Sequence, residues 1–135
     1  MPPDQYPGAI LLVDDDHSIR KLVKECLEGA GYTVFAAGDG VVGLAFFKQR
    51  QEEIALLLTD VDMPGMNGLD LADRILELDG TLPVVFMSGA VTADRGNGCI
   101  PKPFREPELV AKVGTVMGTR RLARRTPKTD HTLPS

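Results

Sequence analysis

The sequence predicts an α/β protein with a parallel sheet covered by helices on both faces. Short, continuously apolar segments alternate along the chain with longer segments whose apolar residues recur at helical spacing. Continuous apolar runs are typical of strands that are buried on both faces of a parallel sheet. Alternating strands and helices imply right-handed crossover connections. A chain of 135 residues with 43% hydrophobic content fits one domain with its own core.

The first strand and helix are marked by a sharp change from apolar to acidic residues. Residues 9–13 (AILLV) form the strand, and three aspartates, 14–16, follow it directly. Residues 17–31 predict an amphipathic helix that stops at Gly29 or Gly31. Its apolar residues at helical spacing are Ile19, Leu22, Val23, Cys26 and Leu27. One of the three aspartates is expected to cap this helix.

The rest of the chain repeats this alternation. Strands are predicted at residues 32–37, 54–59 and 82–87, and a fifth strand near Cys99. Asp39 is predicted to cap a helix on which Val42, Ala45 and Phe46 share a face. Asn67 is the expected cap of a helix over 68–80, with Leu69, Ala72 and Leu76 inward. The last helix, within 103–118, directs Leu109, Val110, Val113 and Val116 to the core.

Composition argues against several classes of function. The net charge is −4, so the chain has no general field for nucleic acid or an anionic membrane. No signal peptide and no apolar run of about 20 residues is visible, so we expect a cytoplasmic protein without membrane association. Cys26 and Cys99 need no disulfide in a domain with its own core. His17 and His131 stand alone, without zinc spacing.

Polar side chains follow three of the predicted strands. Asp14 and Asp15 come after the first strand, Asp60 after the third and Ser88 after the fourth. Because ligands gather at the carboxyl ends of parallel strands, we expect these residues to meet at one edge. Converging carboxylates stay ionised only beside positive charge, and Mg²⁺ suits such a set of oxygens. An aspartate beside Mg²⁺ can accept a phosphoryl group, and Lys102 can balance its charge.

Four motifs in this order resemble the receiver domain of two-component response regulators: VDDD (13–16), LLLTDVDMPGMNG (56–68), FMSGA (86–90) and PKPF (101–104). The resemblance, over about residues 8–118, implies a flavodoxin-like fold with five parallel strands in the order 2-1-3-4-5. It also implies a phosphoryl donor, either a sensor histidine kinase or a phosphotransfer protein, and an unknown downstream protein partner. Such a protein is not an enzyme, apart from Mg²⁺-dependent self-phosphorylation and self-dephosphorylation.

The resemblance assigns a role to each polar residue expected at the carboxyl end of the sheet, called the acidic edge below. Asp60 matches the phosphorylated aspartate, and Asp14 and Asp15 match the pair that holds Mg²⁺. Ser88 and Lys102 match the hydroxyl and the ammonium that contact the phosphoryl group. The resemblance implies that Asp60 itself and the backbone carbonyl at Asp62 complete the set of Mg²⁺ ligands. The Asp62 side chain either tunes the lifetime of the phosphoryl group or is a solvated loop acid.

The chain departs from the family pattern before its fifth strand. Lys102 comes only 14 positions after Ser88, and residues 89–98 include three glycines. A crossover with its helix takes at least about 10 to 12 residues, so we predict that the fourth helix is missing or reduced to about one turn. Cys99 stands where the family commonly has an aromatic switch residue.

Three segments are expected: an N-terminal extension (1–7), the receiver domain (8–118) and a basic tail (119–135). The tail holds Arg120, Arg121, Arg124, Arg125 and Lys128. We interpret it as a solvated helix end rather than a nucleic-acid site, because cations suit the carboxyl end of a helix and the chain is acidic overall.

Other interpretations of the acidic motifs remain open. Taken singly, Asp14 and Asp15 can cap a helix, Asp60 can form a turn, and Ser88 and Lys102 can be ordinary loop residues. A haloacid-dehalogenase-like aspartyl phosphatase would use similar chemistry, but it places its further acids downstream and needs a cap module. A binding module that has lost phosphorylation is the third alternative.

Overall fold

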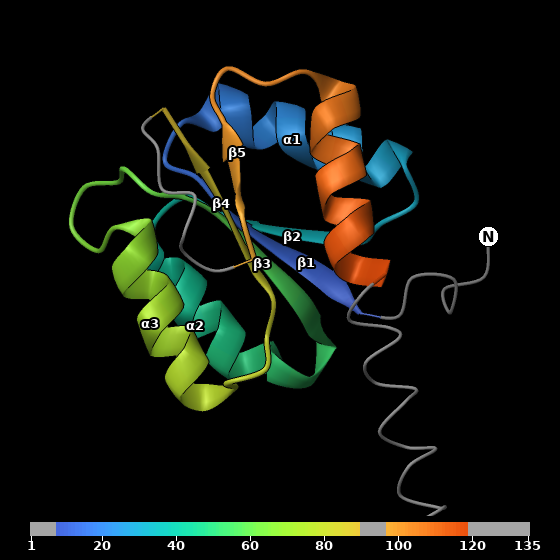
Figure 1. Ribbon diagram of the computed structural model, residues 1–135. Coiled ribbons are helices and arrows are strands. Elements are labelled where there is room, and N and C mark those ends of the chain that lie inside the picture. The colour runs from blue at the N-terminus through green and yellow to red at the C-terminus, as the bar shows by residue number, and fades with distance from the viewer. Residues whose placement is uncertain (1–7, 90–96, 119–135) are drawn as a thin grey trace, which may run out of the picture.

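The computed structural model describes residues 8–89 and 97–118, and Figure 1 shows their arrangement. A final helix covers 106–118 and is called the C-terminal helix below. The other elements, in chain order, are β1 (Ala9–Val13), α1 (His17–Gly29), β2 (Val34–Ala37), α2 (Gly40–Arg50), the short 3-10 helix η2 (Gln51–Glu53), β3 (Ile54–Asp60), α3 (Gly68–Leu78), β4 (Val84–Ser88) and β5 (Cys99–Pro101).

The five strands form one parallel sheet in the order β2-β1-β3-β4-β5, which confirms the predicted fold class and strand order. The register brings the ends of neighbouring strands to one level. Val13 pairs with Thr59, and Asp60 pairs with Met87. The carboxyl ends of β1, β3 and β4 therefore lie side by side.

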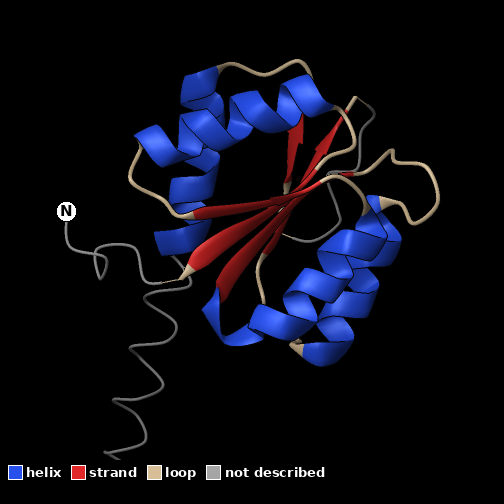
Figure 2. Ribbon diagram, turned by 180° about the vertical axis from the view of Figure 1, so that it is seen from behind, coloured by secondary structure: helices blue, strands red, loops and turns tan. Residues whose placement is uncertain are grey.

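Helices cover both faces of the sheet. The α1 helix and the C-terminal helix lie on one face, and α2 and α3 lie on the other (Figures 1 and 2). Each face has its own apolar cluster. Leu12 and Leu58 pack with Val23 on the first face, whereas Leu11 and Leu57 pack under α3 on the second.

Side-chain caps start the first three helices, as the sequence predicts. Asp16 accepts hydrogen bonds from the amides of Ser18 and Ile19 at the start of α1. Asp39 caps α2 and Asn67 caps α3 in the same way, each with one bond of 2.8 Å. The chain leaves α1 through Gly31, whose φ of 102° is easily adopted only without a side chain.

The predicted helix faces need three corrections. Leu22 is 58% exposed, although its spacing predicts a place on the buried stripe of α1. On α2, Val42 is 50% exposed, and the buried positions are Gly40, Gly43 and Phe47. On α3, the deepest positions include Leu71 and Ile75, and the predicted Leu69 and Leu76 are only partly buried. Helical spacing finds the stripe but can shift it by one residue.

The C-terminal helix agrees with its predicted face. Leu109, Val113 and Val116 are buried against the sheet, and Val110 is half-buried. None of the helices in the described part of the chain has the length and apolar content that a bilayer crossing requires.

Two predictions fall wholly or partly outside the described residues. Gly89, Asn97 and Gly98 are not helical, so residues 90–96 are all that remains for a fourth helix, fewer than two turns at about 3.6 residues per turn. Those seven residues themselves lie outside the description, as do the predicted extension (1–7) and tail (119–135). The three-segment division stays a prediction.

Candidate phosphorylation site at the carboxyl edge of the sheet

The carboxyl edge of the sheet gathers the polar residues that the sequence singles out. Asp14 follows β1 directly, Asp60 ends β3, and Ser88 ends β4. All three are buried, with exposed fractions of 0%, 5% and 0%. Lys102 follows β5 and reaches the same place. The parallel order of the strands therefore brings these residues together at one edge of the sheet.

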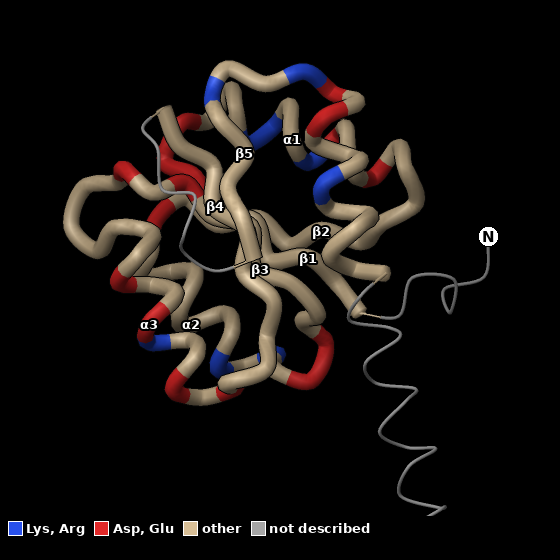
Figure 3. The backbone as a smooth tube through the Cα atoms, in the orientation of Figure 1, with Lys and Arg blue, Asp and Glu red and all other residues tan. Residues whose placement is uncertain are grey.

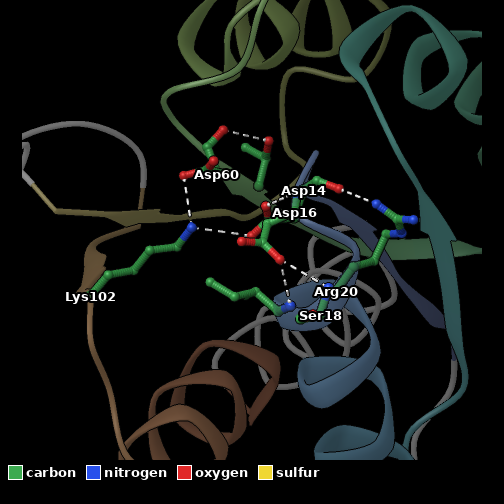
Figure 4. Close-up of polar contacts among 8 residues, drawn as sticks. Asp14, Asp16, Ser18, Arg20, Asp60 and Lys102 are labelled. Carbon is green, nitrogen blue, oxygen red and sulfur yellow. Dashed lines mark hydrogen bonds and ion pairs between the residues drawn. The ribbon is translucent and has the colours of Figure 1, made fainter.

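The ammonium group of Lys102 links the two buried aspartates. Its Nζ lies 3.1 Å from Oδ1 of Asp60 and 3.2 Å from Oδ2 of Asp14, as Figure 4 shows. The Lys102 amide donates to the carbonyl of Ser88 at 2.8 Å, which fixes the start of the side chain. The next peptide bond, to Pro103, is cis. The lysine is thus anchored to β4 and directed toward the aspartates.

Asp14, Asp15 and Asp60 form an acidic cluster that suits a hard divalent cation. One carboxylate oxygen from each lies within 4.8 Å of the others. Figure 3 shows the acidic segments after β1 and β3 close together at this edge. One ammonium contacts two of these carboxylates, so negative charge remains in excess. Oxygen ligands with that excess are the donor set that Mg²⁺ prefers, so these residues fit the ion.

Burial and neighbouring charges shift the pKa values of Asp60 and Lys102. Burial raises the pKa of the Asp60 carboxyl above its usual 3.8, and the nearby Asp14 adds to the rise; Lys102 and the Asp62 amide, which bond the carboxylate, oppose it. Burial alone would lower the pKa of Lys102, but Asp60 and Asp14 outweigh it and raise that pKa. The lysine is therefore charged at neutral pH.

Asp62 and Ser88 lie where the sequence predicts. Asp62 follows Asp60 by two residues, and its side chain is exposed, which agrees with both interpretations of that side chain. Ser88 ends the strand next to that of Asp60, one position beyond Met87, the residue paired with Asp60. The roles of the Asp62 carbonyl and the Ser88 hydroxyl stay predictions.

Hydrogen bonds and close packing also fix the backbone at Asp60. The Thr59 hydroxyl donates to the Asp60 carbonyl at 3.0 Å, and the amide of Gly68 donates to the carbonyl of Val61 at 2.9 Å. A Cβ atom on Gly68 would lie closer to the backbone carbonyl oxygen of Asp60 than real Cβ contacts allow. The start of α3 therefore packs directly on the end of β3.

Sequence reasoning missed one side chain at this edge. Arg20, on the first turn of α1, donates from Nη1 to the backbone carbonyl of Asp14 at 2.6 Å. Its Nη2 lies 3.1 Å from Nδ1 of His17, so His17 contacts an arginine and not a metal ligand set. His131 lies outside the described residues. The three consecutive aspartates before a helix with an arginine at its fourth position are the signal that was available.

Comparisons with known proteins agree with this geometry. The family model of the response regulator receiver domain matches residues 10–114. The chain is 35% identical over 112 residues to the response regulator receiver protein CpdR of Brucella abortus, covering 77% of this chain and 92% of CpdR. Other curated relatives are longer, and the chain spans half of their length or less.

Solved structures give the same result. The receiver domain of the hybrid histidine kinase CckA is 34% identical, with a TM-score of 0.72 over 82% of this chain and 99% of that one. A receiver domain protein from Clostridium thermocellum has a TM-score of 0.80 over 86% of this chain and 98% of that one; at 22% identity it supports the fold alone. The chain belongs to the response regulator receiver family, the phosphorylation-dependent receivers of two-component signalling.

Proposed function

We propose that Asp60 accepts the phosphoryl group, from a sensor histidine kinase or a phosphotransfer protein, and that the reaction depends on Mg²⁺. The observation that supports this most is the position of the Asp60 carboxylate. It ends β3 at the acidic edge, beside Asp14 and Asp15, with the Lys102 ammonium 3.1 Å away. A nucleophile, a compensating cation and a set of metal ligands therefore meet at one point.

The transfer is a substitution at phosphorus. An oxygen of the Asp60 carboxylate forms the new bond to phosphorus, and the bond from phosphorus to the donor's imidazole nitrogen breaks. The electron pair of the broken bond stays on that nitrogen. Burial keeps the carboxylate poorly solvated, and the bonds from Lys102 and the Asp62 amide keep it oriented.

The chain's own residues divide the remaining tasks. Asp14, Asp15, Asp60 and the Asp62 carbonyl would hold Mg²⁺, which when bound offsets the charge of the phosphoryl oxygens. Lys102 already contacts both buried aspartates, so its ammonium can follow the negative charge onto the phosphoryl group. Ser88, at the end of the neighbouring strand, would donate its hydroxyl to the same group.

The output of the protein is proposed to be phosphorelay or docking to another protein. We infer that it catalyses its own phosphorylation from small donors and its own dephosphorylation, and that it has no separate substrate. A cytoplasmic location and a lack of nucleic-acid binding remain predictions. The strand order and the family match over 10–114 favour this function over an aspartyl phosphatase or a module without phosphorylation.

Intact mass measured after incubation with acetyl phosphate and Mg²⁺ tests the proposal. We expect one added phosphoryl group on the wild type and none on Asp60→Asn. Glu52→Gln is the matched control, because it removes one exposed negative charge in η2, away from the acidic edge. It should be phosphorylated like the wild type.

The same incubation separates the alternatives. Continuous phosphate release without a stable adduct would instead favour the phosphatase. An adduct that survives in Asp60→Asn would show that another residue accepts the group.

A further inference from the structure

We propose that Arg20 is a positioning residue for the acidic edge: it holds the backbone between β1 and α1 in the one conformation that lets Asp14 and Asp15 bind Mg²⁺ together. This inference rests on the proposed function of the site. Arg20 touches no reacting atom in it and acts through the Asp14 carbonyl.

The contacts of Arg20 fix it at both ends. Its backbone amide donates to the Asp16 carbonyl at 2.9 Å, the first turn of hydrogen bonding in α1. Its guanidinium reaches back and donates to the Asp14 carbonyl at 2.6 Å. An ionised donor makes this a stronger bond than one between neutral groups. Arg20 therefore ties the first turn of the helix to the end of β1.

Neighbouring groups keep the guanidinium in place. Its Nη2 lies 3.1 Å from His17 Nδ1. Gly38, which follows β2, leaves room for the guanidinium: a Cβ atom built there would lie 3.4 Å from Nη1. Figure 4 shows Arg20 on one side of Asp14 and Lys102 on the other. The planar group contacts the Asp14 carbonyl and the His17 ring through two separate nitrogens, which the single amine of a lysine does not reproduce.

The hydrogen bonds around Asp14 and Asp16 explain why the orientation of Asp15, the residue between them, depends on Arg20. The Asp14 side chain is fixed by the Asp16 amide at 2.9 Å and by Lys102 at 3.2 Å, and its carbonyl is fixed by Arg20. Asp16 is fixed by its cap of α1. Asp15 is exposed, and its direction follows from the peptide planes on either side of it. Without Arg20, the plane after Asp14 loses its one described side-chain contact.

Charge and position predict opposite effects on metal binding, which makes the proposal testable. A cation next to a metal site repels the metal, so removal of the Arg20 charge by itself would tighten Mg²⁺ binding. Loss of positioning would instead weaken it. Loss of a partner that orients metal ligands costs roughly 10- to 100-fold in affinity. We expect about 10-fold weaker Mg²⁺ binding for Arg20→Gln, near the lower end because Asp14 keeps two other bonds.

The experiment measures Mg²⁺ affinity by calorimetric titration for the wild type, Arg20→Gln, Arg20→Lys and Lys21→Gln. Lys21 is the control: it is exposed on the same turn of α1, and its removal takes away one positive charge without the contact. Lys21→Gln should bind Mg²⁺ as tightly as the wild type or slightly more tightly. Arg20→Lys keeps the charge and part of the donor, so its affinity should lie between those of the wild type and Arg20→Gln.

A second measurement separates positioning from loss of folding. Hydrogen exchange of the metal-free proteins should show faster exchange of the Asp16 amide in Arg20→Gln, while the amides of β3 remain as protected as in the wild type. Uniformly faster exchange would mean a general loss of stability and would overturn the proposal. Equal or tighter Mg²⁺ binding by Arg20→Gln would overturn it as well. A wild type that binds no Mg²⁺ would overturn the proposed function itself, and this inference with it.

Discussion

The interior of the sheet and its carboxyl edge differ in chemistry although the same strands supply both. Along β1 and β3, the residues from Ala9 to Val13 and from Ile54 to Leu58 are apolar and at most 4% exposed. One step further along each strand, the buried residues are polar or charged. Within residues 8–89 and 97–118, the buried polar side chains are Asp14, Thr59, Asp60 and Ser88, all at this edge.

Burial therefore has opposite consequences in the two regions. In the interior, removal of apolar surface from water contributes about 25 cal/mol per Å² to folding. At the edge, burial opposes the ionised form of Asp60 and raises its pKa, and only Lys102 and hydrogen bonds offset this. The ionised groups of the edge are therefore buried at a cost in stability. Substitutions should separate the two regions: interior changes should affect folding, and edge changes should affect phosphoryl transfer.

The largest effect on stability is expected in the interior. Leu57→Ala removes a side chain with no exposed surface, and the cavity should lower the free energy of unfolding by about 3 kcal/mol in urea titrations. Leu78→Ala is the control, because Leu78 is 43% exposed and its loss should cost little. Phosphorylation per folded molecule should stay at the wild-type level. Loss of phosphorylation in folded Leu57→Ala would show that the interior and the edge do not act separately.

Gly68→Ala should affect both regions, because Gly68 lies where α3 packs on the backbone of Asp60. The new Cβ would overlap the Asp60 carbonyl, so the strand end must shift. We expect a loss of about 2 kcal/mol of stability, the scale of overpacking, together with slower phosphorylation from acetyl phosphate. Gly29→Ala has no atom within 4 Å of its new Cβ and serves as the control. Normal phosphorylation in Gly68→Ala would mean that the edge tolerates movement of its backbone.

Lys102→Met tests how strongly the edge depends on its cation. Two buried carboxylates would lose a common partner, and loss of one partner of a buried pair is costly. Because the Lys102 side chain is 19% exposed, we expect a moderate loss of about 1 to 2 kcal/mol in metal-free protein at pH 7. Added Mg²⁺ should recover part of it by binding the folded state.

Combining Lys102→Met with Asp60→Asn provides the control for the predicted loss of stability. In the Asp60→Asn background, Lys102→Met should cost clearly less, because one of the two carboxylates is gone. Equal costs in the two backgrounds would show that Lys102 stabilises the fold through packing and not through charge.

Asp60→Asn alone should make the metal-free protein slightly more stable, by roughly 1 kcal/mol at neutral pH, because it removes an incompletely compensated buried charge. The pKa of Asp60 is raised in the folded state, so its favourable contribution is fully present below pH 3.8 and is lost as the pH rises through the folded pKa. The advantage of the asparagine variant should thus be absent below pH 3.8 and grow toward neutral pH. Thermal unfolding in EDTA across this range measures it, and a constant difference would contradict the charge argument.

Much of the difference between the interior of the sheet and its carboxyl edge is visible in the sequence, because each region has a local sequence pattern. Continuous apolar runs such as 9–13 and 54–58 identify strands buried on two faces, and the aspartates after them identify the edge. The family resemblance supplied the strand order and the contact of Lys102 with a phosphoryl group on Asp60, a residue far from it in the sequence. Spacing alone does not specify either.

Two kinds of feature escaped sequence reasoning for physical reasons. The buried face of α2 consists of Gly40, Gly43 and Phe47, and glycines carry no hydrophobic signal although they permit close packing: a Cβ on Gly43 would lie 2.9 Å from Val13. Arg20 looks like an ordinary exposed position of an amphipathic helix. Its role depends on a side chain that turns back to a backbone carbonyl, and such contacts appear only in three dimensions.

The smallest expected effect concerns Cys26, a partly buried thiol on α1. Its charged neighbour is an acid, Glu106 at the start of the C-terminal helix, whereas Asp60 has a cation beside it. Burial, and then the hydrogen bond and negative charge of Glu106, raise the pKa of Cys26 to about 11. In a Cys99→Ser background, alkylation by iodoacetamide should be slow at pH 8 and should rise about tenfold per pH unit, because the thiolate is the reactive form.

Glu106→Gln should lower the apparent pKa of Cys26 and speed alkylation at pH 8, whereas Glu25→Gln, an exposed acid next to Cys26 in the sequence, should change it little. An apparent pKa near that of a free thiol, about 8.5, would show that the contact between α1 and the C-terminal helix opens readily. A pKa near 11 that falls in Glu106→Gln would show that burial and a neighbouring acid together keep the thiol protonated, whereas at Asp60 the Lys102 ammonium opposes the effect of burial.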